Sequence, residues 1–446
     1  MKIVIAGDGE VGFYLAELLS SEHHDITVVD PHNDLVEMIQ KQSDVMAITG
    51  DSTSIEILKS ANIEHADLLI SVVHDENINI ITTIIGKKLG VKKTICRVNN
   101  PEYITPENRE MFKNLGVDEI ISPEIIASKE IIDLLNQTAA TEMFDFSGGR
   151  LSLFLIKLEE DALVLNKSLN QIATEFPHLN FRAVAIHRKG ETIIPKGNNR
   201  FLKDDLAYVI SKPEGINQML SLGGKSHIDI NNIMIIGGGR IGSHAAKQLE
   251  HDFNVKLIDI DYARCERLSN SLNKTLLIHG DARDIQLLEE EGIKSMDAFV
   301  ALTREPETNI LACLLARKYG VKRTIALVEN INFIDIAQNM GIDTIINKKL
   351  ITASYIVRFT LNAEVTSIKC LNGVDAEVLE FVVKEKSFVA NKRIKELKFP
   401  KEAIIGGIVR DSIGYIAVGS LMIEPGDKVV VFSLPQSIYK VDKFFN

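Results

Sequence analysis

Several features that define common protein classes are scarce in this chain of 446 residues. It has no tryptophan and only four cysteines, which lie too far apart in sequence to form a CxxC or zinc-type pattern: Cys96, Cys265, Cys313 and Cys370. The longest apolar runs, such as ADLLISVV, are far shorter than the ~20 residues that a membrane-spanning helix needs. We therefore expect reduced thiols in a cytoplasmic chain, with any membrane connection made through a partner.

The chain has no net positive charge and lacks several common catalytic motifs. The formal net charge of −11 argues against a nucleic-acid partner, because nucleic-acid binders normally present a basic face. The chain opens directly into a strand pattern, so we expect no secretory leader. The motifs GxxxxGK[ST], HExxH and GxSxG are missing, which disfavours nucleotide hydrolysis by a phosphate loop and standard hydrolase chemistry.

The strongest positive signal opens the chain. An apolar run, KIVIAG, leads directly into Gly7, Gly9 and Gly12 in the spacing GxGxxG, which predicts a tight turn that places a pyrophosphate at a helix N-terminus. Asp30 ends the next apolar run at the spacing that holds ribose hydroxyls, and its charge should repel a 2′-phosphate. The pattern predicts NAD or an adenine nucleotide rather than NADP; the alternative is a ligand-free turn with a solvated carboxylate.

Strands and helices alternate from Met1 to about Arg97, which predicts a doubly wound parallel sheet. Open α/β sheets bind ligands at the carboxyl ends of their strands. Arg97 is a charge on an apolar run, and either a bound phosphate or a carboxylate partner would explain it. The residues predicted to bind a ligand in the first half are Gly7, Asp8, Gly9, Glu10, Val11, Gly12, Asp30, Asp51, Ser52, Thr53, Val73, His74 and Arg97.

The second half repeats the first. Residues 50–98 align without a gap at a shift of 230, so that Asn79 falls on Asn309, and the run NIMIIGGGRIG repeats the glycine turn. Leu327 replaces Arg97, which predicts weaker phosphate binding unless Arg240 partly substitutes. The residues predicted for the second site are Gly237, Gly238, Gly239, Arg240, Ile241, Gly242, Asp259, Asp281, Thr303 and Arg304.

Each parallel-sheet unit is followed by a smaller module with a different pattern. After Ser147-Gly148-Gly149 the segments become short strands with few long helices, which predicts a small α+β module. That module also repeats, since LNKSL at 165–169 resembles ANKRI at 390–394. We predict four domains, alternately Rossmann and small α+β, at residues 1–135, 140–225, 229–355 and 360–446.

The residues GDGEVG, Asp30, GDST, ICRVNNPEY and GVDEIISPE, followed by NKSL and ETIIPKG, resemble the TrkA family, whose members carry tandem RCK (KTN) domains. The resemblance covers essentially the whole chain. It implies a cytoplasmic regulatory subunit of a Trk-type potassium uptake system, peripheral on the inner face of the membrane through a TrkH- or TrkG-type subunit. It also implies a homo-tetramer that binds NAD or NADH, with ATP/ADP as alternative ligands, and that is not an enzyme.

Two departures set the second half apart from the family pattern: Leu327, and a following segment five residues shorter than its counterpart. Two other functions compete with the regulatory one. An NAD-dependent oxidoreductase would need a proton-transferring residue facing the nicotinamide, and none stands out. A structural scaffold would leave the glycine turns empty.

The sequence also suggests where copies of the chain meet. Each half carries an isoleucine-rich connector, IISPEIIASKEIIDLL in the first and TIINKKLITASYIVRFTL in the second. Their apolar surface exceeds what one small sheet is expected to cover, and exposed apolar patches usually mark interfaces. We therefore expect these connectors to contribute an assembly surface.

Overall fold

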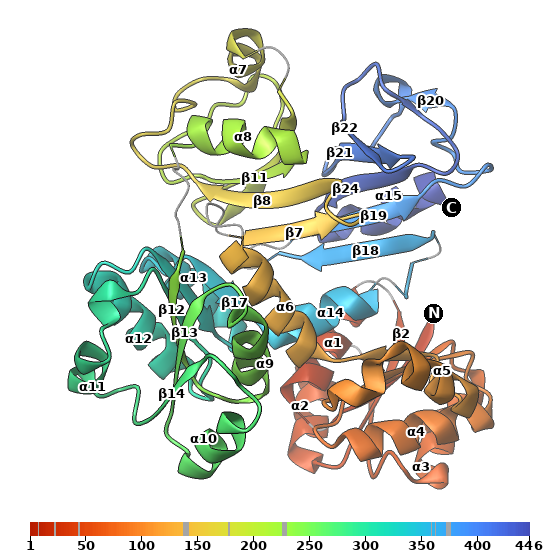
Figure 1. Cartoon of the computed structure of the whole chain (residues 1–446). Coiled ribbons are helices and arrows are strands. Elements are labelled where there is room, and N and C mark those ends of the chain that lie inside the picture. The colour runs from red at the N-terminus through yellow and green to blue at the C-terminus, as the bar shows by residue number, and fades with distance from the viewer. Residues whose placement is uncertain are drawn as a thin grey trace. The chain divides into compact units, whose positions relative to one another are not determined.

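The structure is a computed structural model that describes residues 1–7, 9–21, 24–42, 45–136, 142–176, 179–224, 230–357, 359–361, 363–371 and 376–446 (Figure 1). The chain divides into two compact units. The first comprises Met1–Ile126 and Ile351–Thr360, and the second comprises Ala127–Leu350 and Leu361–Asn446. The four-domain division drawn from the sequence stays a prediction.

The first unit is built on a six-stranded parallel sheet in the order β3-β2-β1-β4-β5-β6. Its strands are β1 (Lys2–Ala6), β2 (Asp25–Asp30), β3 (Met46–Thr49), β4 (Leu68–Ser71), β5 (Lys93–Arg97) and β6 (Glu119–Ile121). The connecting helices are α1 (Glu10–Ser21), α2 (Asn33–Gln42), α3 (Ile55–Ser60), α4 (Glu76–Leu89) and α5 (Pro106–Leu115). This is the Rossmann strand order, so the predicted doubly wound sheet is confirmed.

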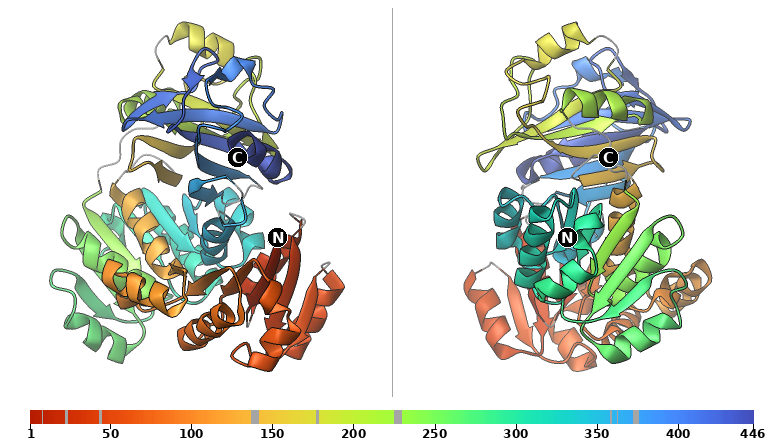
Figure 2. Two further views of the ribbon diagram at one scale, coloured as in Figure 1. Left: turned by 90° about the vertical axis from the view of Figure 1, so that its right-hand side faces the viewer. Right: turned by 60° about the vertical axis from the view of Figure 1, so that its left-hand side comes forward.

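The second unit contains a parallel sheet with the same order, β14-β13-β12-β15-β16-β17. Its strands are β12 (Asn232–Ile236), β13 (Asn254–Asp259), β14 (Leu276–His279), β15 (Ala298–Ala301), β16 (Arg323–Leu327) and β17 (Thr344–Ile346). Its helices are α9 (Arg240–Leu249), α10 (Tyr262–Ser269), α11 (Ile285–Glu290), α12 (Pro306–Lys318) and α13 (Ile334–Asn339). Helices flank this sheet as they flank the first (Figure 2), which explains why the inner strands are apolar along their whole length.

The second unit also holds both small modules, each with a five-stranded antiparallel sheet. The first module has the order β10-β9-β11-β8-β7 and contains β7 (Glu142–Phe146), β8 (Leu151–Lys157), α7 (Leu169–Glu175), β9 (Phe181–Arg188), β10 (Glu191–Ile193), β11 (Leu206–Ser211) and α8 (Ile216–Leu222). The second has the order β18-β19-β24-β21-β22 and contains β18 (Val365–Cys370), β19 (Glu377–Val382), β20 (Lys392–Arg393), β21 (Ala403–Arg410), β22 (Ile413–Ile416), β23 (Met422–Ile423), β24 (Lys428–Ser433) and α15 (Ile438–Phe445).

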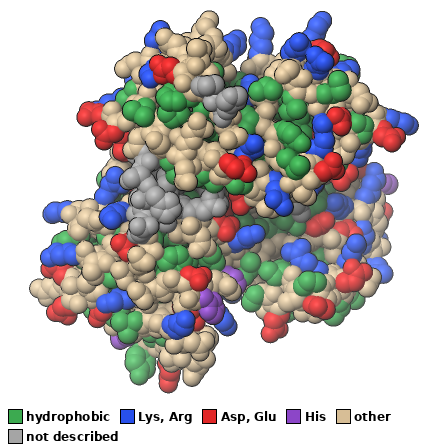
Figure 3. Space-filling model, turned by 45° about the horizontal axis from the view of Figure 1, so that its top comes forward, with side chains coloured by type: hydrophobic (Ala, Val, Ile, Leu, Met, Phe, Trp, Pro, Cys, Tyr) green, Lys and Arg blue, Asp and Glu red, His purple; other side chains and the backbone are tan. Residues whose placement is uncertain are grey.

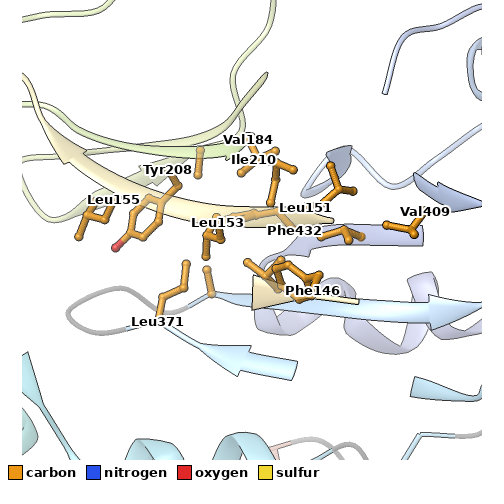
Figure 4. Packing of buried hydrophobic residues seen from close by; sticks show 14 residues of the cluster. Phe146, Leu151, Leu153, Leu155, Val184, Tyr208, Ile210, Leu371, Val409 and Phe432 are labelled. Atoms are coloured by element: carbon orange, nitrogen blue, oxygen red, sulfur yellow. The ribbon is translucent and has the colours of Figure 1, made fainter. Parts of the chain in front are cut away.

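The two small modules share one hydrophobic core. Phe146, Leu153 and Tyr208 of the first module pack in the same buried cluster as Val378 and Phe432 of the second. Figure 4 shows the labelled side chains of the two modules converging between their strands. Since aromatic and aliphatic side chains this large contribute roughly 1.5–3 kcal/mol each when fully buried, the cluster fixes the two modules together. On the molecular face in Figure 3, acidic and basic side chains are interspersed rather than segregated.

The helices that follow the two parallel sheets are divided between the units. In α6 (Pro123–Asn136), the residues from Ala127 onward belong to the second unit, whereas in α14 (Lys348–Val357) those from Ile351 onward belong to the first. Within the first unit, the hydroxyl of Tyr355 on α14 donates to Glu119 Oε2 at 3.2 Å.

The isoleucine-rich connectors therefore do not form the exposed patches that their sequences suggested. Their central apolar residues are at most 6% exposed: Ile131, Leu134, Leu135, Ile351, Ile356 and Val357. The expectation of exposed patches was wrong because these side chains are buried, each in a unit that includes segments distant in the sequence. Among the described residues, no helix combines the length and apolar character needed to cross a membrane.

Candidate functional site

A glycine turn follows the first strand of each parallel sheet. β1 ends at Ala6 and α1 begins at Glu10, while β12 ends at Ile236 and α9 begins at Arg240. The backbone N–H of Gly7 donates to Val29 O at 3.1 Å, and that of Gly237 donates to Ile258 O at 2.9 Å. Each turn is therefore tied to the neighbouring strand and points the start of a helix toward the carboxyl edge, where its N–H groups favour an anion.

The outer glycines of each turn are required for close packing. A Cβ atom at Gly7 would lie 3.1 Å from the Cα of Gly12, and one at Gly242 would lie 2.0 Å from the carbonyl oxygen of Gly237. A Cβ at Gly239 would meet nothing within 4 Å. The turns thus bring helix and strand into contact, and the middle glycine of the second turn faces open space.

The middle glycine of the first turn lies beside His74. A Cβ at Gly9 would be 3.6 Å from His74 Cε1, so the structure brings the turn after β1 next to the loop after β4. This is the point where the strand order reverses, at which doubly wound sheets bind ligands. Val11 is half-buried on α1 and Ile241 is buried on α9. Asp8 and the side chain of Glu10 lie outside the described residues.

The carboxylates predicted to hold a ribose have different surroundings. Asp30, at the end of β2, is 2% exposed, and its Oδ1 accepts hydrogen bonds from the backbone N–H of His32 at 2.8 Å and lies 3.0 Å from His32 Nδ1. Asp259, at the end of β13, accepts from Gly238 N–H at 2.6 Å and from Arg264 Nη1 at 2.9 Å. The second carboxylate is thus bound to its own turn and to an arginine of α10.

The pairing with Asp259 also shifts the pKa of Arg264. Its hydrogen bonds raise the pKa of the Arg264 guanidinium above the usual value for arginine. At the same distance from the end of β2, the first half has Leu35. Arg264, which pairs with Asp259, therefore has no charged counterpart near Asp30 at this position.

The third-strand loops are held mainly by their own hydrogen bonds. Asp51 Oδ1 accepts from both the N–H and the hydroxyl of Thr53 at 2.8 Å. Ser52 is buried, and its hydroxyl lies 3.0 Å from that of Thr82 on α4. In the second half, Arg283 binds Asp281 and lowers its pKa by hydrogen bonding. Ser52 is thus placed to support the loop rather than to face a ligand.

A buried asparagine joins the ends of the fourth and fifth strands in each half. Asn79 accepts from the N–H of Val73 at 2.8 Å and donates to the carbonyls of Val73 at 2.8 Å and Arg97 at 3.0 Å. Asn309 makes the same contacts to Thr303 and Leu327. Our sequence prediction did not include either asparagine among the site residues. The available signal was a polar amide that both halves keep at the same position of a largely apolar helix.

Arg97 has a carboxylate partner. The guanidinium, 8% exposed at the end of β5, donates through Nη2 to Glu124 Oε1 at 3.0 Å. Within the part of the chain that is described, Arg97 Nε and Glu124 Oε2 have no hydrogen-bond partner. In the second half Leu327 replaces Arg97 and Lys349 replaces Glu124, so both members of the pair are changed together. Arg240, at the start of α9, and Arg304 are exposed cations near the second turn.

The described residues offer little for covalent or metal chemistry. Burial raises the pKa of the Cys96 thiol to about 12 and also raises that of Cys313, so neither is a thiolate near neutral pH. Among the described residues, no three His, Cys, Asp or Glu side chains are placed to share a metal ion. What the two edges present is backbone N–H groups, carboxylates and arginines, which suit binding of phosphates and hydroxyls.

Comparison with known families identifies the chain's relatives. The TrkA-N domain model matches residues 3–123 and 233–348, and the TrkA-C domain model matches residues 378–446. The chain belongs to the TrkA family. It is 32% identical to the Trk system potassium uptake protein TrkA of Vibrio alginolyticus, with 97% of this chain and 95% of that protein covered. It is also 32% identical to the TrkA homolog of Archaeoglobus fulgidus over the full length of both.

Solved structures show the same fold at lower sequence similarity. The crystal structure of the GsuK RCK domain is 17% identical and gives a TM-score of 0.60, covering 99% of this chain and 94% of that one. The GsuK channel bound to NAD gives a TM-score of 0.61, with 99% of this TrkA-family chain and 78% of the channel covered. The predicted fold of Rossmann and small RCK-type modules is therefore confirmed.

Proposed function

We propose that this chain is the nucleotide-binding regulatory subunit of a Trk-type potassium uptake system. The observation that carries the proposal is the match to named TrkA proteins over at least 97% of the chain, with a glycine turn after the first strand of both parallel sheets. The turns give a place for an effector in each half. The relatives' names supply the transport system in which such an effector would act.

The ligand of the first site is NAD or NADH, with ATP and ADP as alternatives. Its phosphates bind the N–H groups between Gly7 and Gly12, and its ribose hydroxyls donate to Asp30. The GsuK channel, which shares the fold, has been solved bound to NAD and bound to ADP. Because Arg97 faces Glu124, that arginine contributes to a bound phosphate only when the ion pair opens.

Regulation requires binding alone. A nucleotide shifts the equilibrium between two arrangements of the chain if its affinity differs between them, and such coupling is typically about 1–3 kcal/mol per effector. Several equal sites in one assembly add their contributions. The protein therefore gates a membrane subunit without catalysing a reaction.

The assembly is a homo-tetramer that lies on the inner face of the membrane under a TrkH- or TrkG-type subunit. Support comes from apolar side chains that are 47–64% exposed at matching positions of the two halves. They lie on α4 and α5 in the first half and on or directly after α12 and α13 in the second: Ile81, Met111 and Leu115, and Leu311, Ile336 and Met340. An apolar surface kept in both copies fits repeated pairing of similar domains.

Titration calorimetry on the full chain with NAD, NADH, ATP and ADP tests the ligand. Potassium flux through proteoliposomes that contain a TrkH-type subunit, with and without this protein, tests the regulatory role. We expect nucleotide binding, a tetramer by light scattering, and a flux that changes when one nucleotide replaces another. A scaffold would give no binding heat, and an oxidoreductase would show substrate-dependent turnover of NAD. A nucleotide-insensitive monomer that leaves flux unaltered would overturn the proposal.

A further inference from the structure

The first small module contains a cavity of about 570 Å³ that is distinct from both strand edges. It lies against α7, β9 and β11, and residues of β21 and β22 from the second module complete its wall. Leu169, Phe176, Phe181, Ile404 and Ile416 line it and are only half-buried, so they turn uncovered apolar surface toward the space. Ligand pockets in proteins commonly measure about 300–1,000 Å³ and have mostly apolar walls.

One charged side chain lines this cavity among the described residues, and it is Arg182 on β9. Its Nη1 donates a hydrogen bond to a neutral acceptor, the carbonyl oxygen of Ala417. In the described part of the chain, no carboxylate lies within ion-pair distance of it. Burial lowers the pKa of its guanidinium, but arginine remains protonated at any ordinary pH. A cation in an apolar wall without a countercharge is costly, and an anion in the cavity would offset that cost.

The sister module carries no charge at the strand position that matches Arg182. Arg188 binds Asp205 and Arg410 binds Asp427, both at 2.7 Å, and these matching pairs align the two modules. In this alignment Arg182 falls on Ile404 of β21. An apolar residue therefore occupies the same strand position in the sister module, where it lines the same cavity.

We propose that the cavity between the small modules binds a small amphipathic carboxylate, with its anionic group on Arg182 and its apolar body along Leu169, Phe176 and Ile416. The guanidinium forms a bidentate pair with a carboxylate, which adds geometric selectivity to the charge attraction. The apolar walls reject small hydrophilic anions, since these would lose hydration without gaining contacts. This site is separate from the nucleotide sites, and the inference stands independently of the proposed function.

Titration calorimetry of the nucleotide-free full chain with decanoate, below its micelle concentration, tests the site. We expect one decanoate per chain. Arg182→Ile, which copies the sister module, should weaken binding by at least about tenfold, as expected for a lost charge-assisted hydrogen bond. Arg182→Lys should keep most of the affinity, and Arg150→Ile, at an exposed arginine of the same module, should change nothing. 1-Naphthoate, run in parallel, distinguishes a ring-shaped ligand from a linear one.

A second variant separates binding from folding. Ala173→Phe fills the cavity from α7, where the side chain is exposed at the rim, and leaves Arg182 in place. We expect it to abolish decanoate binding while the thermal transition of the chain stays unchanged. Equal decanoate affinity in the natural chain and Arg182→Ile would overturn the proposal. So would decanol binding as tightly as decanoate, or the absence of binding heat for both carboxylates.

Discussion

The two Rossmann domains of this chain share the contacts that join the ends of their strands but differ where a ligand would bind. Asn79 and Asn309 join the fourth and fifth strands in the same way. An aspartate–threonine contact also repeats, at 2.8 Å from the backbone N–H of Thr94 to Asp118 and of Thr324 to Asp343. Duplication has therefore preserved the residues that position the strand ends.

The difference concerns what occupies each carboxylate at the second strand. In the first domain Asp30 Oδ1 accepts from the backbone N–H of His32, and the position that matches Arg264 is Leu35. In the second domain Asp259 accepts from Gly238 N–H and from Arg264 of α10. In the second domain, the N–H of Gly238 in the glycine turn thus donates to Asp259, the carboxylate predicted to hold a ribose. A nucleotide that bound at the second turn would have to compete with these internal hydrogen bonds for Asp259.

The largest expected effect concerns the ion pair that only the first domain has. Arg97→Leu copies the second domain at this position but leaves Glu124 buried without its partner. Removing one member of a buried pair typically costs about 3–5 kcal/mol. Amide hydrogen exchange of β5 in the full chain should speed up accordingly. The double variant Arg97→Leu/Glu124→Leu should recover most of the protection, and equal exchange in both variants would contradict a structural role for the pair.

The next effect distinguishes the domains by their acid sensitivity. Glu250, after α9, is 2% exposed, and burial alone would raise its pKa, but hydrogen bonds from Asn273, Lys274 and Thr275 outweigh that effect and lower the pKa to about 2. The matching residue in the first domain is Ser20. A folded pKa below the unfolded value gives stability that is present above about pH 4.5 and is lost as the pH falls toward 2.

The shift from 4.5 to about 2 corresponds to about 3 kcal/mol. We expect hydrogen exchange around β14 to accelerate between about pH 4.5 and pH 2 relative to the matching β3 segment. Glu250→Gln should reduce protection near neutral pH and remove most of this pH dependence. Parallel behaviour of the two domains across this range would contradict the assignment.

A smaller effect tests the inequality of the two sites directly. Asp30→Ala should weaken nucleotide binding to the full chain by about 1–3 kcal/mol, the range for hydrogen bonds to a charged group. Asp259→Ala is the matched control and should leave the measured affinity unchanged, because Arg264 and Gly238 already occupy that carboxylate. Calorimetry with NADH and ATP measures both. The inequality fails if Asp259→Ala costs as much as Asp30→Ala.

Much of the fold was predictable because it rests on local patterns. The glycine turns, the apolar strands and the gapless shift of 230 are together enough to specify two doubly wound sheets. Asp30 and Asp259 were placed at strand ends by the same reasoning, and each lies there. Such features depend on residues close in sequence, which is why periodicity and spacing reveal them.

The contacts that distinguish the two sites depend on residues whose pairing no spacing rule gives. From the sequence, a bound phosphate and a carboxylate partner explained the charge of Arg97 equally well. In the structure its partner is Glu124, on the helix after the next strand. The sequence analysis did not single out Arg264, which lies on α10 and donates to Asp259. The burial of the connector helices was missed for the same reason, since the unit to which each helix belongs includes segments far away in the sequence.

The smallest effect is a gain of binding in the second domain. Arg264→Leu copies Leu35 and removes the guanidinium from Asp259, which still accepts N–H groups from Gly238 and Asp261 and so remains partly satisfied. The lone pairs that Arg264 occupied then become available to a ribose hydroxyl, which is worth about 1 kcal/mol, or roughly fivefold in affinity. In an Asp30→Ala background, in which the first site is weakened, calorimetry should detect this gain as added weak NADH binding. Arg267→Leu, at an exposed arginine of the same helix, should add no binding. If Arg264→Leu also adds none, the second turn is closed to nucleotides by more than its arginine.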